Sequence, residues 1–302
     1  MTEQQLTAFD GETIHLRVWE PNEAPSLVVL LFHGMGEHSA RYERFASALN
    51  DAGIAVLCQD HRGHGPNAEL RGHFSDRNGW TAVMHDCASV YEYAQKQYAD
   101  KPVVVMGHSM GSFIAQDFAM NFGSALAGLI LSGTNWASKL QLYPGIVLAK
   151  LMSIGGRRRA YSPLLDKLGF DGFNKRFEPS RTAFDWLSRD EAEVDKYVDD
   201  PLCGGPYTIG LWIDLLGGVI GISSDAAINR IRSDLPILIF GGEDDPVGGD
   251  RGLGNIMTHY AQTSHQRLKL KIYEGGRHEM LNETNRDEVT ADVLEWLSRI
   301  KT

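Results

Sequence analysis

Apolar runs of strand length alternate with helix-like segments along most of this chain, and this alternation restricts its fold more than any other feature. A run that is apolar at nearly every position is typical of a parallel strand covered on both faces. Apolar residues spaced three or four apart, with a glycine following, indicate amphipathic helices between the runs. The pattern predicts an α/β fold with a mostly parallel, doubly wound sheet. The strand-like runs lie at 26–32, 54–58, 103–106, 126–131, 237–240 and 268–273.

Two regions depart from this alternation. Near the N-terminus, residues 5–9 and 13–19 flank Asp10-Gly11, a pair that favours a tight β-hairpin. From about residue 135 to 229 the alternation gives way to helical fragments and Gly-Gly pairs. We therefore expect a core formed by residues 1–134 and 230–302, with residues 135–229 inserted as a helical cap.

Composition excludes several classes of protein. The 302 residues include 29 Lys and Arg against 39 Asp and Glu, a formal charge of −10 that disfavours nucleic acid as a partner. The three cysteines have no ligand-like spacing, which predicts neither a disulfide framework nor a cysteine-based zinc site. The N-terminus lacks the basic and apolar regions of a secretory signal. We expect a cytoplasmic protein without a metal or cofactor.

The sharpest motif is Gly107-His108-Ser109-Met110-Gly111, which lies between an apolar run and a helix-like segment. In a tight strand-to-helix turn the small glycines avoid steric conflict, and the serine hydroxyl is lifted to the head of the helix. The Met110 N–H at the start of that helix can stabilise a developing oxyanion. This context predicts Ser109 as a nucleophile.

A serine nucleophile needs a base, and the base needs an orienting acid. His278 follows the strand-like run 268–273, and the acidic group Glu243-Asp244-Asp245 follows the run 237–240. Both sets lie where open α/β sheets place their ligands, at the carboxyl ends of strands. His278 is the predicted base, and from the residues alone the three acids compete for the orienting role.

The loop after the first apolar run reads His33-Gly34-Met35-Gly36-Glu37-His38. Its glycines let the backbone approach a substrate carbonyl closely, so the Met35 N–H is the predicted second oxyanion donor.

These motifs resemble those of the α/β-hydrolase superfamily, and within it the monoacylglycerol lipase, lysophospholipase and S33 serine-peptidase-like group. The resemblance covers residues 5–134 and 230–300 and rests on four stretches: His33 to Tyr42, Asp60 to Gly65, Gly107 to Gly111 and Arg277 to Glu279. It favours Asp245 as the acid, because Asp245-Pro246-Val247 matches the group's Asp-x-Val pattern. It also implies that Glu37 and Arg41 lie near a polar headgroup, whereas Leu281 replaces a third headgroup contact, a histidine.

The resemblance implies a serine esterase that acts on small lipid esters, with monoacylglycerols expected first. Alternatives are a lysophospholipase or short-chain carboxylesterase, an S33-type aminopeptidase, and a ligand-binding hydrolase fold without catalysis. The inserted segment is rich in large apolar residues, which a lid over an acyl pocket needs, and a transient contact of this cap with a membrane surface is also expected. Candidate pocket residues are Leu148, Leu151, Met152, Trp186, Leu211, Trp212, Leu215 and Leu216.

Overall fold

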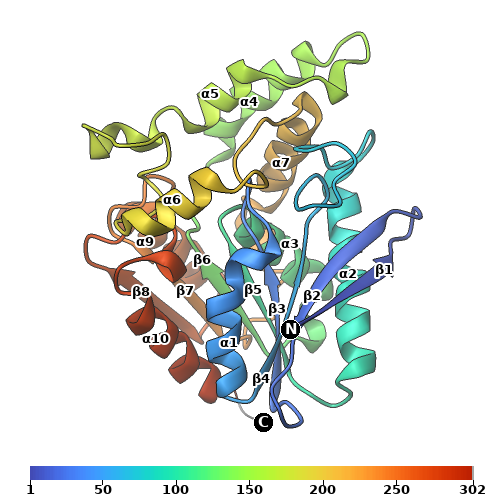
Figure 1. Ribbon diagram of the computed structural model, residues 1–302, viewed down its shortest axis with the longest axis vertical. Coiled ribbons are helices and arrows are strands. Elements are labelled where there is room, and N and C mark those ends of the chain that lie inside the picture. Colours follow the sequence, from blue (N-terminus) through green and yellow to red (C-terminus); the bar gives the residue numbers. More distant parts are fainter. Residues whose placement is uncertain (301–302) are drawn as a thin grey trace.

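The computed structural model describes residues 1–300, which form an eight-stranded sheet with helices on both faces (Figure 1). The strand order is β1-β2-β4-β3-β5-β6-β7-β8, with β1 and β2 antiparallel to their neighbours and the other pairings parallel. The predicted α/β class is therefore confirmed. The strands are β1(Thr2–Thr7), β2(Thr13–Trp19), β3(Leu27–Phe32), β4(Ile54–Gln59), β5(Val103–His108), β6(Gly128–Ser132), β7(Ile237–Gly242) and β8(Leu268–Tyr273).

Helices cover the two faces of the sheet with separate hydrophobic clusters. In β3, Val28 and Leu30 pack toward one cluster, while Val29 and Leu31 pack toward the other. This alternation explains why the strand is apolar at every position. The first cluster includes side chains of α2(Gly79–Gln97), α3(Met110–Phe122) and α9(Gly249–Gln262); the second includes those of α1(Glu43–Asp51) and α10(Arg286–Ser298).

Five helices lie between β6 and β7 in the chain, and Figure 1 shows α4 to α7 above the sheet at the top of the view. Side chains of α7 belong to the same hydrophobic cluster as those of α2 and α3. A Cβ on Gly218 would lie 2.1 Å from the Trp80 ring, so this glycine allows α7 to approach the core closely. These helices are α4(Lys139–Met152), α5(Pro163–Phe170), α6(Glu191–Asp199), α7(Ile209–Ile222) and α8(Asp225–Ile228). Short 3-10 helices are η1(Ser39–Tyr42), η2(Gly123–Ala125), η3(Arg157–Arg159), η4(Phe173–Phe177) and η5(Met280–Asn282).

The N-terminal hairpin differs in detail from its prediction. β1 ends at Thr7, which pairs with Thr13, so residues 8–12 form a wider loop than a two-residue Asp10-Gly11 turn. Ala8 and Glu12 close this loop with a backbone hydrogen bond of 2.8 Å, and Gly11 adopts a φ of 88°. The glycine thus serves a left-handed position within a longer loop, not the tip of a tight turn.

Candidate active site

Ser109 occupies a strained turn between β5 and α3. Its φ of 53° and ψ of −120° are rare for a residue with a side chain and cost about 1–3 kcal/mol. The flanking glycines are required by contact: a Cβ on Gly107 would lie 2.1 Å from the Gly111 carbonyl oxygen, and one on Gly111 would lie 2.0 Å from that of Phe32. The local sequence therefore permits a turn tight enough to present the Ser109 side chain.

The order of the strands brings two loops together at this turn. From β3 the chain passes to β4 on one side and then returns to β5 on the other, so β3 and β5 are neighbours at a topological switch point. Open α/β sheets bind ligands beyond the carboxyl ends of strands at such points. The loop bearing Met35 follows β3, and Ser109 follows β5. Met110 begins α3, so its N–H has no acceptor within the helix.

His278 and Asp245 meet beyond the ends of β7 and β8. The His278 Nδ1 lies 2.9 Å and 3.0 Å from the two carboxylate oxygens of Asp245, and both side chains are buried. The competing acids have other partners: Glu243 accepts from the Gly275 N–H at 3.0 Å, and Asp244 pairs with Arg176. Of the three carboxylates, Asp245 is the one positioned to orient the imidazole.

Burial alone would lower the pKa of His278, but the adjacent Asp245 carboxylate outweighs it and raises the pKa above the usual value of 6.5. The imidazolium that forms when His278 accepts a proton is therefore stabilised by Asp245. The rings of His108 and Trp186 pack beside His278, with centroids 4.8 Å and 5.0 Å away. Burial lowers the pKa of His108 to about 4, so this neighbour stays neutral.

Ser109 and His278 border one cavity of about 540 Å³, together with Met35 and Met110. Within residues 1–300 the Ser109 hydroxyl and His278 are not hydrogen-bonded to each other. Such contacts are often long before substrate binds. The structure thus gathers the predicted nucleophile, base and oxyanion donors around a single cavity.

Most of the cavity wall is apolar and comes from the inserted segment and from α3. Four of the predicted pocket residues border it: Trp186, Trp212, Leu215 and Leu216. The prediction was wrong for Leu148, Leu151, Met152 and Leu211, which do not border it. Leu151 is 60% exposed on the outer surface of α4, whereas Leu211 is fully buried in the core. Helical spacing indicates an apolar side but does not tell a cavity wall from a packed core or an outer face.

A buried ionic cluster closes the polar end of the cavity. Glu37 accepts from the Gly34 N–H and, at 2.7 Å, from the Tyr42 hydroxyl. Arg41 donates to Glu37 at 3.0 Å and to both oxygens of Glu279 at 2.6 Å and 2.7 Å. The cluster therefore connects the loop that carries Met35 to the residue that follows His278.

The two predicted headgroup residues differ in position. Glu37 and Glu279 border the cavity, whereas Arg41 lies behind them and does not. Burial disfavours the charge on Glu37, but Arg41 beside it holds the pKa of this carboxyl well below its usual range. Leu281 is buried in the cluster beneath α1 and α10. The motif Arg277-His278-Glu279 indicates no role for Glu279, because its contact with Arg41 joins residues far apart in the chain.

A family model described as "Serine aminopeptidase, S33" matches residues 23–285. The chain belongs to this family. Among its relatives, the monoglyceride lipase of Mus musculus is 29% identical over 298 residues, covering 97% of this chain and 89% of that protein. The monoacylglycerol lipase of Mycolicibacterium smegmatis is 27% identical over 302 residues, covering 98% and 96%. The structure of a thermostable carboxyl esterase from Bacillus coagulans in complex with glycerol matches with a TM-score of 0.93 and 29% identity, covering 100% and 99%.

Proposed function

We propose that this S33-family protein is a serine hydrolase that cleaves carboxylic esters, with monoacylglycerols as its main substrate class. The observation that carries the proposal is the meeting of the Ser109 turn and the His278–Asp245 pair at the polar end of a mainly apolar cavity. An acyl chain matches the apolar wall, and the ester carbonyl then lies beside Ser109. The likeness to monoglyceride lipases over nearly the whole chain supports the same assignment.

In the proposed mechanism the Ser109 oxygen attacks the ester carbonyl carbon while His278 Nε2 accepts the hydroxyl proton. Asp245 holds the imidazole by its Nδ1 and stabilises the imidazolium. The Met35 and Met110 N–H groups stabilise the oxyanion. His278 then gives the proton to the leaving alcohol, which leaves an acyl-enzyme on Ser109. A water molecule, deprotonated by His278, attacks this ester, and the fatty acid leaves as Ser109 regains its proton.

The charge at the polar end favours a neutral headgroup. Glu37 and Glu279 carry two negative charges against the single positive charge of Arg41, and both carboxylates border the cavity. Such a surface accepts hydrogen bonds from hydroxyl groups and repels a phosphate. We therefore place monoacylglycerols and simple medium-chain esters ahead of lysophospholipids.

The same negative charge also favours a second candidate, an aminopeptidase, because buried carboxylates can bind a substrate's protonated amino group. The mainly apolar cavity of about 540 Å³ favours the acyl chain of an ester over the small N-terminal residue of a peptide substrate, which carries the amino group. Aminoacyl anilides distinguish the two functions, since a peptidase should prefer them to monoolein.

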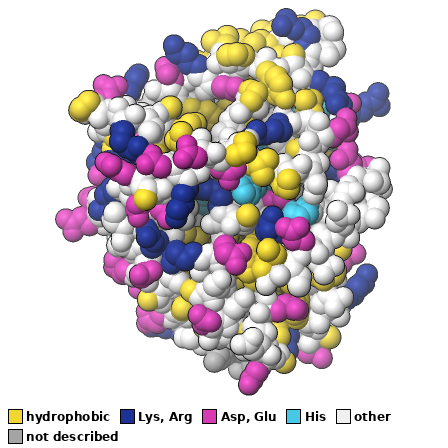
Figure 2. All heavy atoms as spheres, viewed as in Figure 1, with side chains coloured by type: hydrophobic (Ala, Val, Ile, Leu, Met, Phe, Trp, Pro, Cys, Tyr) yellow, Lys and Arg dark blue, Asp and Glu magenta, His cyan; other side chains and the backbone are white. Residues whose placement is uncertain are grey.

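We propose further that residues 135–229 act as a cap whose outer face contacts lipid surfaces. Exposed apolar side chains recur every three or four residues along α4, and α5 adds two more, so that they can form one continuous stripe. Figure 2 shows hydrophobic side chains gathered at the upper end of the molecule. Among residues 1–300, no helix combines the length and apolar character needed to cross a bilayer, and a cytoplasmic location stays a prediction. The exposed residues are Leu140, Tyr143, Val147 and Leu151 on α4, Ile154 in the turn that follows it, and Leu164 and Leu168 on α5.

The test of the ester hydrolase is a substrate panel run with the wild-type protein and Ser109→Ala. The panel contains p-nitrophenyl esters from acetyl to palmitoyl, monoolein, lysophosphatidylcholine and aminoacyl anilides. The proposal expects monoolein and medium-chain esters to give the highest kcat/KM and Ser109→Ala to remove their hydrolysis while circular dichroism stays unchanged. A preference for aminoacyl anilides would establish the peptidase instead, and a best substrate at acetyl would establish a short-chain carboxylesterase.

A further inference from the structure

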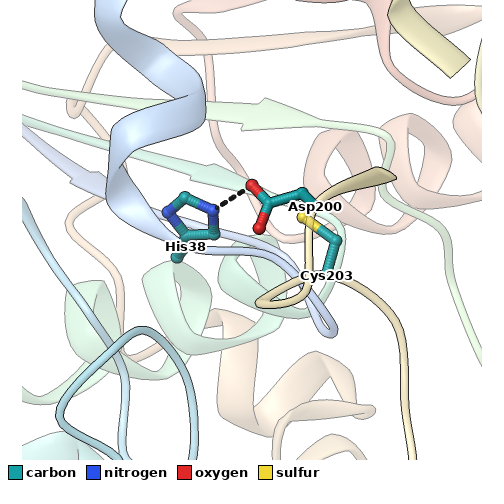
Figure 3. A group of neighbouring side chains, drawn as sticks. All are labelled: His38, Asp200 and Cys203. Atoms are coloured by element: carbon teal, nitrogen blue, oxygen red, sulfur yellow. Dashed lines mark hydrogen bonds and ion pairs between the residues drawn. The ribbon is translucent and has the colours of Figure 1, made fainter. Parts of the chain in front are cut away.

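Three possible metal ligands converge beside the active site, at the junction of the core and the inserted segment. His38, Asp200 and Cys203 each offer one ligand atom, and these atoms all lie within 4.8 Å of one another. Figure 3 shows the side chains meeting from two separate parts of the chain. The His38 Nε2 lies 2.8 Å from the Asp200 Oδ2, and the Cys203 thiol completes the group.

We propose that these three residues form a binding site for a divalent ion of the zinc type, with water as the fourth ligand. Imidazole nitrogen, carboxylate oxygen and thiolate sulfur are the ligand atoms that zinc takes in proteins, so the free Cys203 thiol would release its proton to solvent as the ion binds. In a tetrahedral site with zinc bonds of about 2.0–2.3 Å, the ligand atoms lie about 3.3–3.8 Å apart. Small side-chain movements of His38, Asp200 and Cys203 suffice to reach this spacing.

The surroundings of the group hold it in place and leave it accessible. The Leu202 N–H donates to the Asp200 Oδ1 at 2.8 Å, and the Cys203 N–H donates to the Asp200 carbonyl at 3.0 Å. These bonds fix the turn that carries two of the three ligands. His38 and Asp200 also border a surface cleft beside Arg41 and Arg286, through which an ion can reach the site.

The site lies next to the loop that carries the predicted oxyanion donor Met35. The carbonyl of Gly36 accepts two hydrogen bonds from the inserted segment, one from the Gly204 N–H and one from the Tyr197 hydroxyl, both at 2.8 Å. A bound ion would add a coordination link between the same two regions, since His38 follows Gly36 closely and Cys203 precedes Gly204. The ion would therefore fasten the inserted segment to the oxyanion loop.

The alternative is that His38 and Asp200 form an ordinary ion pair, with the thiol as a neighbouring hydrogen-bond donor. The chain contains a second histidine–aspartate pair, which serves as a control to distinguish a metal site from an ordinary ion pair. His259 Nδ1 lies 2.8 Å from Asp225 Oδ1, and among the described residues no third candidate ligand completes that group. His259→Ala is therefore the control for metal binding by a histidine–aspartate pair alone.

The experiment is a calorimetric titration of Zn²⁺ into the full chain without a histidine tag, under reducing conditions after treatment with a chelator. We expect one site per chain and a raised Tm with zinc, because an ion bound only by the folded state stabilises it. Cys203→Ala and Asp200→Asn should weaken binding by at least the roughly 10- to 100-fold that loss of a supporting residue typically costs. His259→Ala should bind as the wild type does.

Co²⁺ gives a second readout, because a thiolate bound to cobalt adds a charge-transfer absorption that imidazole and carboxylate do not. This band should appear with the wild type and be absent with Cys203→Ala, whereas buried Cys58 and Cys87 remain in both proteins. Binding that Cys203→Ala leaves unchanged, or the absence of one-to-one binding, would overturn the proposal. Both titrations run without substrate, so their outcome is independent of the proposed ester hydrolysis.

Discussion

The two ends of the cavity are built in opposite ways. At the polar end, Asp245 and Glu37 are buried, Arg41 is largely covered, and each is held by hydrogen bonds to named partners. At the other end most of the wall is formed by apolar side chains, and the nearby outer surface of α4 leaves Leu140 84% exposed. The reacting groups need fixed geometry, whereas an acyl chain needs only apolar surface. Substitutions at the first end should therefore have much larger effects.

The largest effect among substitutions around His278 is expected at Asp245. Asp245→Asn should lower kcat by about 10⁴-fold. This is the loss in the serine protease type case, where the same substitution leaves the catalytic histidine in the wrong tautomer. Glu243→Gln and Asp244→Asn are the matched controls, because their carboxylates contact Gly275 and Arg176 instead. Steady-state kinetics on one p-nitrophenyl ester compares all three variants, and equal small losses would mean that another group orients His278.

The same residue sets the pH dependence. His278 must be neutral to accept a proton. Because its pKa is raised above 6.5, kcat/KM should already fall at a pH above 6.5 when the solution is acidified. Removing the Asp245 charge leaves burial as the dominant influence, so the residual activity of Asp245→Asn should persist to lower pH than that of the wild type. A shift of the acidic limb to higher pH would contradict the electrostatic role assigned to Asp245.

Arg41 should matter next, through stability as well as activity. Arg41→Met leaves Glu37 and Glu279 buried without their cation, a change that costs about 3–5 kcal/mol of unfolding free energy. Arg299→Met removes an exposed ion pair with Glu295 and should cost no more than about 0.5 kcal/mol. Urea unfolding measures both. A small loss for Arg41→Met would show that the cluster does not hold the polar end together.

The sequence predicts the chemistry that lies in contiguous motifs, but it does not predict contacts between residues that are far apart in the chain. The glycines around Ser109 signalled the turn because steric contact requires them, and the strand pattern located the loops of Asp245 and His278. The contact between Arg41 and Glu279 could not be predicted, because nothing in the neighbouring sequence distinguishes either residue from a charged residue on the surface. Likewise Leu211 and Leu215 share one helix and one residue type, yet only Leu215 borders the cavity.

The apolar end predicts a graded effect of acyl length. Each buried methylene should add about 0.8 kcal/mol, or about fourfold in kcat/KM, until the cavity is full. Leu216→Trp, which adds volume to the cavity wall, should move the plateau to shorter chains. Leu140→Trp makes the same change on the outer surface of α4 and should leave the plateau where it is. An unchanged plateau in Leu216→Trp would mean that the acyl chain binds elsewhere.

The smallest effect on soluble substrates is expected on the outer face of α4 and the turn that follows it. Replacing Leu140, Val147 and Ile154 by serine removes exposed apolar surface without touching the cavity, so kcat/KM on a short soluble ester should change less than about twofold. Binding to neutral phosphatidylcholine vesicles, followed by co-sedimentation, should fall strongly, since these side chains would otherwise be buried in lipid. Vesicle binding that survives the triple substitution would place the contact on another surface.

Labelling with a fluorophosphonate, with the adduct located by peptide mass spectrometry, shows directly whether Ser109 is the nucleophile. We expect one adduct per chain on Ser109, formed rapidly by the wild type and slowly by Asp245→Asn, because the activated hydroxyl attacks phosphorus as it attacks a carbonyl. Ser109→Ala should remain unlabelled. An adduct on another residue, or equal labelling of Ser109→Ala, would show that Ser109 is not the nucleophile.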